Sequence, residues 1–336
     1  MKSLIKKPVI DQLINFEQLT TDAVRPSSLV VDSIRLQREF ISAATSENTR
    51  RAYRSAVRHF LDWGGNLPAD ESIIVNYLLS FSDSLNPRTL SLKITALSQW
   101  HRHQGFSDPC AAPHVRKVLL GISRSRGRPA EKAAALLLED VEKIVTFQQQ
   151  DISLKALRDC ALLQIGFFGG FRRSELVSLK VENLAWQKEG LLIQLPRSKT
   201  DQTGRGISKA IPYGGGICCP ALALKKWLNS AKIHNGSIFR SVNRWGAVAM
   251  DGINAASVNA ILVHWASRVG ISHVSEISSH SLRRGMATSA YRSGASLRDI
   301  KRQGGWRFDG TVQGYIDDAD RFTENALTGL LKTKTT

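Results

Sequence analysis

Apolar residues recur at helical spacing along most of the chain. In residues 46–65 they follow the i, i+4, i+7, i+8 pattern of an amphipathic helix, and Ser46 or Asn48 could cap its first turn. Residues 86–105 show the same pattern, with Asn86 as the expected cap and a proline in the first helical position. The first third of the chain is therefore predicted to be all-helical, with basic residues on its polar faces.

Helical periodicity resumes at residue 136 and continues in separate segments towards the end of the chain. The exception is residues 190–214, where Leu191, Ile193 and Leu195 alternate with other residues at the period of a β-strand. The polar stretch DQTGRG predicts a turn, after which ISKAIPY forms a return strand. The pattern predicts a mainly α protein: an all-helical N-terminal domain plus a mostly α domain with a small antiparallel β-sheet.

Changes in composition divide the chain, whose 336 residues are enough for roughly two domains. The stretch GISRSRGRPAEKAAA is polar and basic and contains Gly, Ser and Pro, which predicts a linker. The predicted segments are an N-terminal extension (1–35), a helical domain (36–122), the basic linker (123–135), a mostly α domain (136–319) and a C-terminal helix or tail (320–336).

The charge of the chain narrows the classes of partner. There are 46 lysines and arginines against 29 acidic residues, a net charge of +17, which points to a polyanion and most often to nucleic acid. A membrane surface is the weaker alternative, because we find neither an apolar run long enough for a membrane span nor a signal peptide. The four cysteines show no C-x-x-C spacing, so we expect no zinc site and a reducing, cytoplasmic compartment.

Basic side chains on the polar faces are the candidates for contact with a phosphate backbone. They lie on the first two predicted helices, in the linker and in two arginine pairs of the second domain. The set comprises Arg50, Arg51, Arg54, Arg58, Arg88, Lys93, Arg124, Arg126, Arg128, Arg173 and Arg284. His101, Arg102 and His103 are also expected to face outward from the second helix. The alternative interpretation is a solvated helical bundle.

Four short segments of the second domain carry the candidate chemistry. They contain, in chain order, Arg172 with Glu175, Lys199 in the predicted hairpin, His280 with Arg283, and Trp306 with Tyr315. His280 and Arg283 are three residues apart and share one helix face, in a first turn whose backbone N–H groups favour anions. Taken singly, each residue has an ordinary structural explanation, such as core packing, an exposed turn or a pair within one helix turn.

Together these side chains suit attack on a phosphodiester. Two guanidinium groups can donate to the non-bridging oxygens and neutralise the charge that builds up at phosphorus. A tyrosine hydroxyl can be the nucleophile when a base takes its proton, and a lysine or histidine can return a proton to the departing oxygen. The sequence has no dense carboxylate cluster for a metal, so we expect neither a metal nor another cofactor.

These segments resemble the tyrosine recombinase (phage integrase) family, which includes Cre-like and Xer-like site-specific recombinases. The resemblance rests on RRSE at 172–175, the hairpin lysine, HSLR at 280–283, and GW at 305–306 followed by a tyrosine nine positions on. The segment SENTRRAYRSAVRHFLDW resembles the family's helical core-binding domain. The similarity covers roughly residues 36–331.

The resemblance implies a role for each residue. Tyr315 would attack the scissile phosphate and form a 3′-phosphotyrosyl link, releasing a 5′-OH. Arg172 and Arg283 would hold the phosphate. Lys199 would act as general acid on the leaving 5′ oxygen, and His280 would assist proton transfer. Because the bond energy stays in the phosphotyrosine, strands would be rejoined without ATP.

The sequence departs from the family pattern at two points. Trp306 stands where many relatives have a histidine, which removes one titratable group from the implied site. Both arginine motifs are doubled, and the spacing favours the first arginine of each pair, which leaves Arg173 and Arg284 to contact DNA or hold the fold. Glu175 would hold the local hydrogen-bond network.

The resemblance also implies the partners. They are double-stranded DNA with inverted-repeat core sites and further copies of the chain, as a dimer on each site and a homo-tetramer on two duplexes. Residues 320–336 would pack on a neighbouring subunit, and the protein would be nucleoid-associated in the cytoplasm. Two alternatives remain: a DNA-relaxing enzyme of the type IB topoisomerase kind, and a catalytically idle DNA-binding protein of the same fold. The separate helical domain, the linker and the C-terminal helix favour the recombinase.

Overall fold

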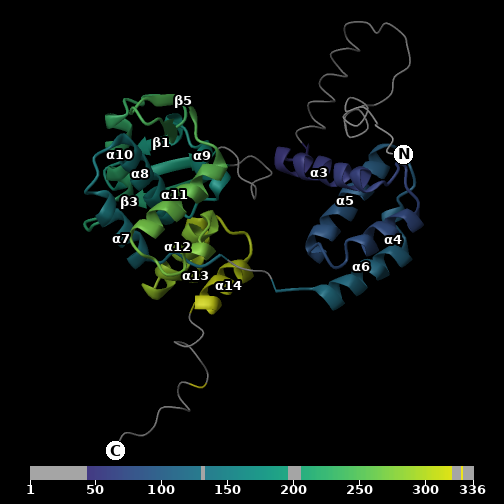
Figure 1. The fold of residues 1–336 in the computed structure, drawn as a ribbon. Helices are drawn as coiled ribbons and strands as arrows, with labels where there is room; N and C mark the ends of the chain where they lie inside the picture. Colours follow the sequence, from purple (N-terminus) through teal and green to yellow (C-terminus); the bar gives the residue numbers. More distant parts are fainter. Residues whose placement is uncertain (1–43, 130–132, 196–205, 320–326, 328–336) are drawn as a thin grey trace, which may run out of the picture. The chain divides into compact units, whose positions relative to one another are not determined.

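The computed structural model describes residues 44–129, 133–195, 206–319 and 327, and Figure 1 shows its helices and strands. The chain divides into two compact units, Met1–Ala130 and Glu131–Thr336, each with its own hydrophobic core. None of the helices in the described ranges combines the length and the apolar character that crossing a bilayer requires. The predicted extension and, apart from Leu327, the predicted C-terminal tail fall outside the described residues.

Within its described residues the first unit is all-helical, as predicted. Its elements are α3 (Glu47–Trp63), α4 (Glu71–Ser80), α5 (Pro87–His103), the 3₁₀ turn η1 (Pro109–Ala111) and α6 (Pro113–Arg126). The side chain of Ser46 caps α3 by accepting a hydrogen bond from the backbone N–H of Thr49. Asn86 caps α5 by accepting from the N–H of Arg88. These local signals therefore set where both helices begin.

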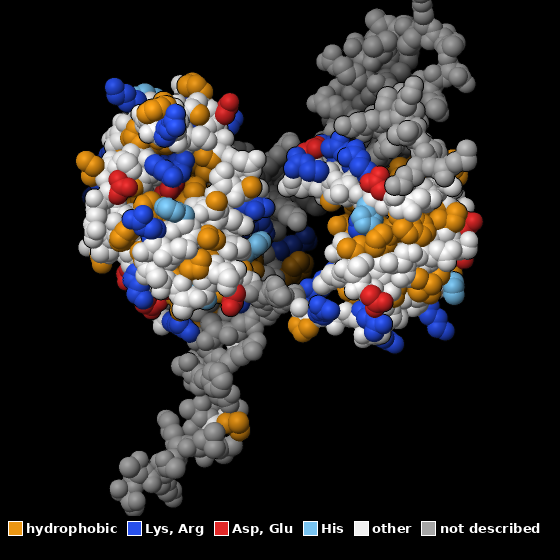
Figure 2. Space-filling model, in the orientation of Figure 1, with side chains coloured by type: hydrophobic (Ala, Val, Ile, Leu, Met, Phe, Trp, Pro, Cys, Tyr) orange, Lys and Arg blue, Asp and Glu red, His pale blue; other side chains and the backbone are white. Residues whose placement is uncertain are grey.

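The apolar stripes predicted for α3 and α5 form the core of this unit. Val57 and Phe60 of α3 are fully buried with Leu90 of α5. The ring of Tyr77 from α4 lies edge-on to Phe60, with 5.1 Å between the ring centroids. Burial of this stripe leaves the arginine-bearing face of α3 in solvent, and Figure 2 shows Lys and Arg side chains gathered over that helix.

Two expectations for α5 are wrong. Lys93 is only 8% exposed and His101 is fully buried, although both were expected to face outward. His101 accepts a hydrogen bond at Nε2 from the N–H of Ala69 (3.0 Å), while its Nδ1 lies 2.8 Å from the carbonyl oxygen of Leu97. The physical reason is that α3, α6 and η1 all pack against α5, so little of its circumference remains free. Burial also lowers the pKa of Lys93.

The basic linker starts later than its composition suggested. Residues 123–126 belong to α6, and Arg124 and Arg126 lie in the last turn of that helix. Arg126 Nε donates to Asp83 Oδ1 at 2.7 Å. Arginine and serine tolerate a helix, and the helix stops only where Gly127 supplies the first break. Arg128 follows in exposed, non-helical chain.

The second unit is mostly helical with two small antiparallel sheets, so the predicted fold class is confirmed. Its helices are α7 (Leu138–Gln148), α8 (Leu154–Phe168), α9 (Arg173–Ser178), α10 (Pro220–Ser230), α11 (Ala255–Arg268), α12 (Ser279–Arg292), α13 (Leu297–Gly304) and α14 (Asp309–Ala319). The 3₁₀ turns η2 (Val181–Asn183) and η3 (Val274–Glu276) precede β1 and α12. The strands are β1 (Leu184–Trp186), β2 (Gly190–Leu195), β3 (Ile207–Pro212), β4 (Arg240–Val242) and β5 (Val248–Gly252).

The predicted pair of strands is present as β2 and β3. They run antiparallel in the order β1-β2-β3, with Ile193 opposite Lys209. Leu191, Ile193 and Leu195 are all buried, as their alternation predicted. The sequence did not reveal β1, β4 and β5, because β1 and β4 have three residues each and β5 is mostly exposed, so none shows an apolar alternation.

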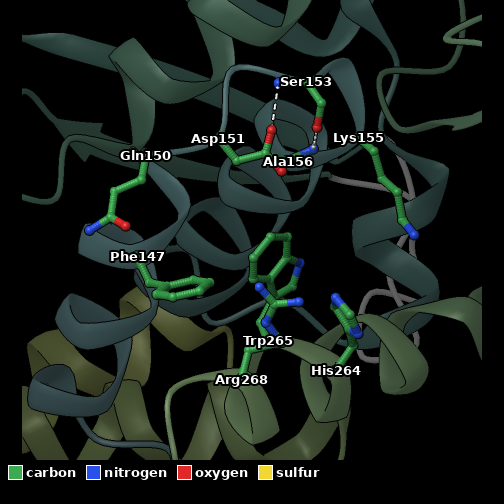
Figure 3. Close-up of a pocket in the computed structure, with 9 residues that line it drawn as sticks. All are labelled: Phe147, Gln150, Asp151, Ser153, Lys155, Ala156, His264, Trp265 and Arg268. Atoms are coloured by element: carbon green, nitrogen blue, oxygen red, sulfur yellow. Dashed lines mark hydrogen bonds between the residues drawn. The ribbon is translucent and has the colours of Figure 1, made fainter.

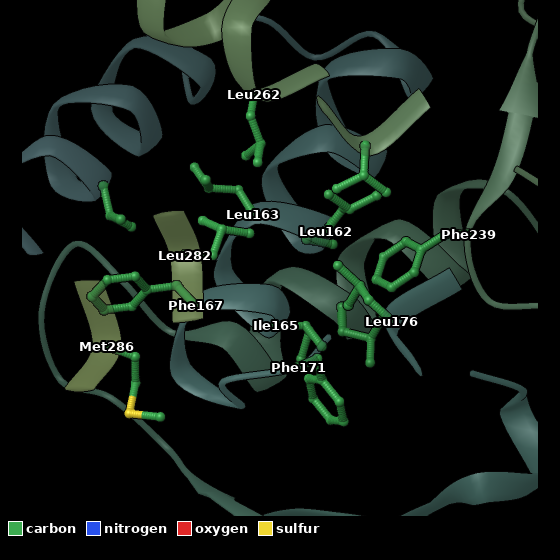
Figure 4. Packing of buried hydrophobic residues seen from close by; sticks show 14 of the residues in the cluster. Leu162, Leu163, Ile165, Phe167, Phe171, Leu176, Phe239, Leu262, Leu282 and Met286 are labelled. Atoms are coloured by element: carbon green, nitrogen blue, oxygen red, sulfur yellow. The ribbon is translucent and has the colours of Figure 1, made fainter. Parts of the chain in front are cut away.

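Helix α8 runs through the core, and α7, α10 and α12 pack against it. Figure 4 shows Phe167 of α8 with Leu282 and Met286 of α12 on one side of that core. Gly285 lets α12 approach the chain before α7, since a Cβ atom there would lie 1.7 Å from the carbonyl oxygen of Leu136. This close approach sets the position of α12, which carries two of the candidate catalytic residues.

Candidate active site

Arg172 is positioned by the turn that ends α8. Gly170 has a left-handed backbone, φ +53°, which redirects the chain so that Arg172 becomes the N-cap of α9. Glu175, one turn into α9, is buried and holds Arg172 at two points. Its Oε1 accepts from Arg172 Nη1 at 2.6 Å, and its Oε2 accepts from the Arg172 backbone N–H at 2.9 Å. This pairing fixes the guanidinium of Arg172, which stays partly exposed.

Arg283 lies one turn into α12, which starts at a Ser278 cap. Its side chain is 2% exposed. Nη1 donates to the carbonyl oxygens of Gly170 and of Gly304, the latter at 2.6 Å. Its guanidinium carbon is 4.1 Å from the ring centroid of Trp306. Arg283 thus joins the turn before α9 to the end of α13.

One donor of Arg283 lacks a partner among the described residues: its Nη2 is buried and makes no hydrogen bond to any of them. Burial is the main cause that lowers the pKa of Arg283 to about 10; the positive charge of Arg172 adds to this shift, whereas Glu175 and Tyr315 oppose it. A buried, charged N–H without an acceptor is unfavourable, so this geometry suits an anion that arrives from outside.

His280 sits at the exposed start of the same helix. Partial desolvation lowers its pKa below the ordinary value, and the charges of Arg283 and Arg173 lower it further. The imidazole is therefore neutral near pH 7 and can accept a proton. Four arginines act electrostatically on this one ring, which shows how closely the positive charge is concentrated here.

Trp306 and Tyr315 complete this region. Helix α13 ends at a left-handed Gly305, φ +68°, and Trp306 follows with 7% of its surface exposed. The ring of Tyr315, on α14, lies 6.0 Å from the Trp306 ring and nearly perpendicular to it. The guanidinium carbon of Arg284 is 5.1 Å from the Tyr315 ring centroid. Trp306 thus contacts both the buried arginine and the candidate nucleophile.

The structure brings most of the candidate residues into one region of the second unit. Those that it gathers are Arg172, Glu175, His280, Arg283, Trp306 and Tyr315, with Arg173 and Arg284 beside them. Lys199 lies outside the described residues. The arginines of α3 that were proposed as DNA contacts belong to the other unit, where Arg51, Arg54 and Arg58 are exposed.

Lys209, which the sequence motifs did not single out, lies next to this region. Its side chain is 2% exposed, and its Nζ donates to the carbonyl oxygens of Gly169 (2.6 Å) and Gln303 (2.7 Å). A signal was present in the return strand, where Lys209 has the same phase as Ile207 and Ile211 and therefore faces the core. A lysine at an inward position of a strand has to find buried acceptors.

A shallow basic groove borders the site. Its volume is about 520 Å³, and it runs from the start of β3 past the end of α13. Its lining residues are Gly206, Ile207, Arg298, Lys301, Arg302, Gly305, Trp306 and Arg307. Four cations around an open groove suit an extended polyanion better than a small neutral ligand.

A second pocket lies elsewhere on the second unit. It has a volume of about 330 Å³ and is formed between the end of α7, the start of α8 and α11, as Figure 3 shows. Phe147 and Trp265 are among its lining residues, and the guanidinium carbon of Arg268 lies 5.3 Å from the Phe147 ring centroid. None of the candidate catalytic residues lines it.

The described residues contain no group of three or more His, Cys, Asp or Glu side chains that could hold a metal ion. Their four cysteines are free thiols. The residues gathered at the site supply cations, a phenol and an imidazole, which are groups that can act on an anion.

The chain matches the model of the Phage integrase family over residues 135–321. It is 34% identical over 297 residues to the integrase/recombinase xerD homolog of Selenomonas ruminantium, an alignment that covers 85% of this chain and 86% of that protein.

Two solved structures share the fold. One is the XerH site-specific recombinase bound to its palindromic difH substrate, with a TM-score of 0.58, 16% identity and coverage of 94% of this chain and 95% of that one. The other is a lambda integrase tetramer bound to a Holliday junction, with a TM-score of 0.55, 15% identity and coverage of 93% and 81%.

Proposed function

This chain belongs to the phage integrase family and is a tyrosine-type site-specific recombinase, and we propose that it cuts and rejoins DNA through a covalent bond between Tyr315 and a 3′ phosphate. The observation that carries this proposal is the buried Arg283, whose Nη2 has no partner among the described residues and which stacks on the ring beside Tyr315. A phosphodiester oxygen supplies the missing acceptor. Arg172, held by Glu175, supplies the second cation.

The chemical step needs no group beyond these side chains and Lys199. The Tyr315 hydroxyl oxygen attacks phosphorus as its proton leaves, and neutral His280 is suited to accept that proton. The bond from phosphorus to the 5′ oxygen breaks, and Lys199 protonates the leaving oxygen. The two arginines neutralise the charge on the non-bridging oxygens in the transition state. Attack by a 5′-OH of another strand reverses these steps and reseals the DNA without ATP.

The test uses nicked duplexes drawn from the organism's own genome. Wild-type protein should form a DNA adduct that survives SDS, while Tyr315→Phe should form none. Tyr291→Phe is the matched control, since Tyr291 lies on α12 and is not part of the proposed machinery. An adduct that persists in Tyr315→Phe would show that another residue is the nucleophile. Absence of any adduct in the wild type, with tight DNA binding, would favour the idle DNA-binding protein.

The proposed partner is double-stranded DNA with an inverted-repeat core site, bound by a dimer, with two such sites joined in a tetramer. The lambda integrase of similar fold has been solved as a tetramer on a Holliday junction, which supports this assembly. Residues 320–336 are the segment proposed to join neighbouring subunits. Deleting them should abolish synapsis of two DNA sites while binding to one site persists, and unchanged synapsis would contradict the proposal.

Contacts with the DNA backbone are proposed for the basic residues of both units. Exposure of Arg51, Arg54 and Arg58 on α3, and of Arg88 at the start of α5, supports their part in this surface. The buried Lys93 is no longer proposed as a contact. Recombination of two sites, as opposed to relaxation of supercoils alone, separates this function from that of a type IB topoisomerase.

A further inference from the structure

Lys209 is a buried lysine whose hydrogen bonds to the described residues all go to backbone carbonyl groups. Its Nζ donates to Gly169 O at 2.6 Å and to Gln303 O at 2.7 Å, and it lies 4.7 Å from the ring centroid of Phe171. No carboxylate among the described residues forms an ion pair with it. The two acceptors come from the end of α8 and the end of α13, which lie 134 residues apart in the chain (303 − 169).

The acceptors of Lys209 stand next to those of Arg283. Lys209 holds the carbonyls of Gly169 and Gln303, and Arg283 holds those of Gly170 and Gly304. Lys209 of β3 and Arg283 of α12 therefore bind consecutive carbonyl groups in each of the same two turns. One of these turns leads into Arg172, and the other leads into Trp306.

A third side chain, that of Gln303, also links these elements. Gln303 Nε2 donates to the carbonyl oxygens of Phe168 (3.0 Å) and Ala210 (3.1 Å). Phe168 precedes Gly169, one of the acceptors of Lys209, and Ala210 follows Lys209 in β3. The end of α8, the end of α13 and strand β3 are thus joined by side-chain to backbone hydrogen bonds on both sides of Lys209.

Stability alone does not account for a lysine here. Burial is the main cause that lowers the pKa of Lys209 to about 7; the charges of Arg283 and Arg172 add to this shift, and Glu175 opposes it. An apolar side chain of similar volume would avoid this desolvation. Both the ammonium and the neutral amine have enough N–H groups for two carbonyls, so the contacts persist in either state.

We propose that Lys209 is a positioning residue of the recombination reaction, which sets the Gly169–Gly170 turn against the Gln303–Gly304 turn so that Arg172 and Arg283 meet at one phosphate. The inference rests on the proposed function, because it assigns those arginines to a phosphate. Lys209 itself does not touch the DNA. It acts through the geometry of the two turns, and a misplacement of about 1 Å in such a site can slow a reaction by roughly 100-fold.

The test compares Lys209→Met with Ile211→Ala. Ile211 lies two residues along β3 on the same face and is 2% exposed. Its truncation therefore weakens the fold without removing the side-chain hydrogen bonds of Lys209 or Gln303. The substrate is a nicked duplex that the wild type captures as an adduct. At saturating protein and well below the melting temperature, Lys209→Met should form adduct roughly 30- to 100-fold more slowly, with a DNA dissociation constant changed by less than about threefold. Ile211→Ala should keep the wild-type rate.

Four results would overturn the inference. One is a wild-type rate in Lys209→Met, and another is an equal loss of rate in Ile211→Ala at an equal loss of melting temperature. If Lys209→Met fails to fold, Lys209→Gln carries the same comparison, because its amide can still donate to one carbonyl, and a wild-type rate in it overturns the inference. A wild type that forms no adduct contradicts the proposed function instead. In that case the inference is tested with inorganic vanadate. If Lys209 aligns the two arginines, vanadate should raise the melting temperature of wild type more than that of Lys209→Met. Equal increases would overturn the inference.

Discussion

The guanidinium of Arg283 stacks on the indole of Trp306, with 4.1 Å between the guanidinium carbon and the ring centroid. The same guanidinium donates to two carbonyl oxygens through Nη1 and leaves Nη2 without a partner among the described residues. The guanidinium is therefore held by the ring and, through Nη1, by the backbone. Under the proposed function, this Nη2 binds an oxygen of the phosphate, and such preorganised donors stabilise a phosphoryl transition state.

Arg283→Lys should slow adduct formation by roughly 100- to 1,000-fold, the usual effect of removing one preorganised donor. A lysine keeps the charge but loses the planar fork, so it cannot hold both carbonyls, stack on Trp306 and bind phosphate together. Single-turnover cleavage of a nicked duplex measures the rate. Arg292→Lys, at the exposed end of the same helix, is the control and should react as wild type. Comparable rates for the two variants would contradict the role of Arg283.

Because of His280, the rate of adduct formation should fall at acidic pH, with a midpoint below the ordinary histidine pKa. Desolvation and the nearby arginines lower its pKa from 6.5, so the imidazole stays neutral at pH 6.5 and gains a proton only at lower pH. The rate of adduct formation should fall as the pH falls through that lowered pKa. Measured between pH 5 and 8, this acid limb of the rate profile should be absent in His280→Gln. A limb centred above 6.5, or one retained in the variant, would exclude this assignment.

Lys209 should make stability depend on pH. Its pKa is about 7 in the folded protein and 10.5 in an ordinary lysine, so between these values the unfolded chain binds a proton that the folded chain lacks. The free energy of unfolding contributed by this group therefore rises with pH across that window. Urea unfolding at pH 7, 8 and 9 should show wild type gaining stability relative to Lys209→Met. A constant difference would mean that Lys209 stays charged when folded.

Gly285→Ala should destabilise the protein and displace α12. The added Cβ would lie 1.7 Å from the carbonyl oxygen of Leu136, a backbone atom that cannot rotate away. We expect a loss of about 2 kcal/mol or more in the free energy of unfolding, typical of an overpacked core. Gly121→Ala in α6 is the control, since nothing lies within 4 Å of its Cβ and alanine favours a helix. Equal stability of Gly285→Ala and wild type would show that the two segments can move apart freely.

The sequence alone determined the features that depend on near neighbours in the chain. The Ser46 and Asn86 caps lie where polar residues precede an apolar stripe, and Leu191 and Ile193 face inward because strand side chains alternate. The Arg172–Glu175 pair likewise follows from a spacing of three residues. Such signals are local, since each partner is within a few residues, and they can be read without knowing the fold.

Only the tertiary structure decided which charged groups are buried and what they bind. Lys93 is polar and lies on an amphipathic helix, yet packing of other helices around α5 removed its expected exposure. Arg283 and Lys209 find their acceptors in turns separated from them by as many as 113 residues. A buried cation needs hydrogen-bond acceptors, and here the acceptors are carbonyl oxygens of distant turns. Because packing of the whole unit brings those turns together, the sequence around each cation does not reveal its partners.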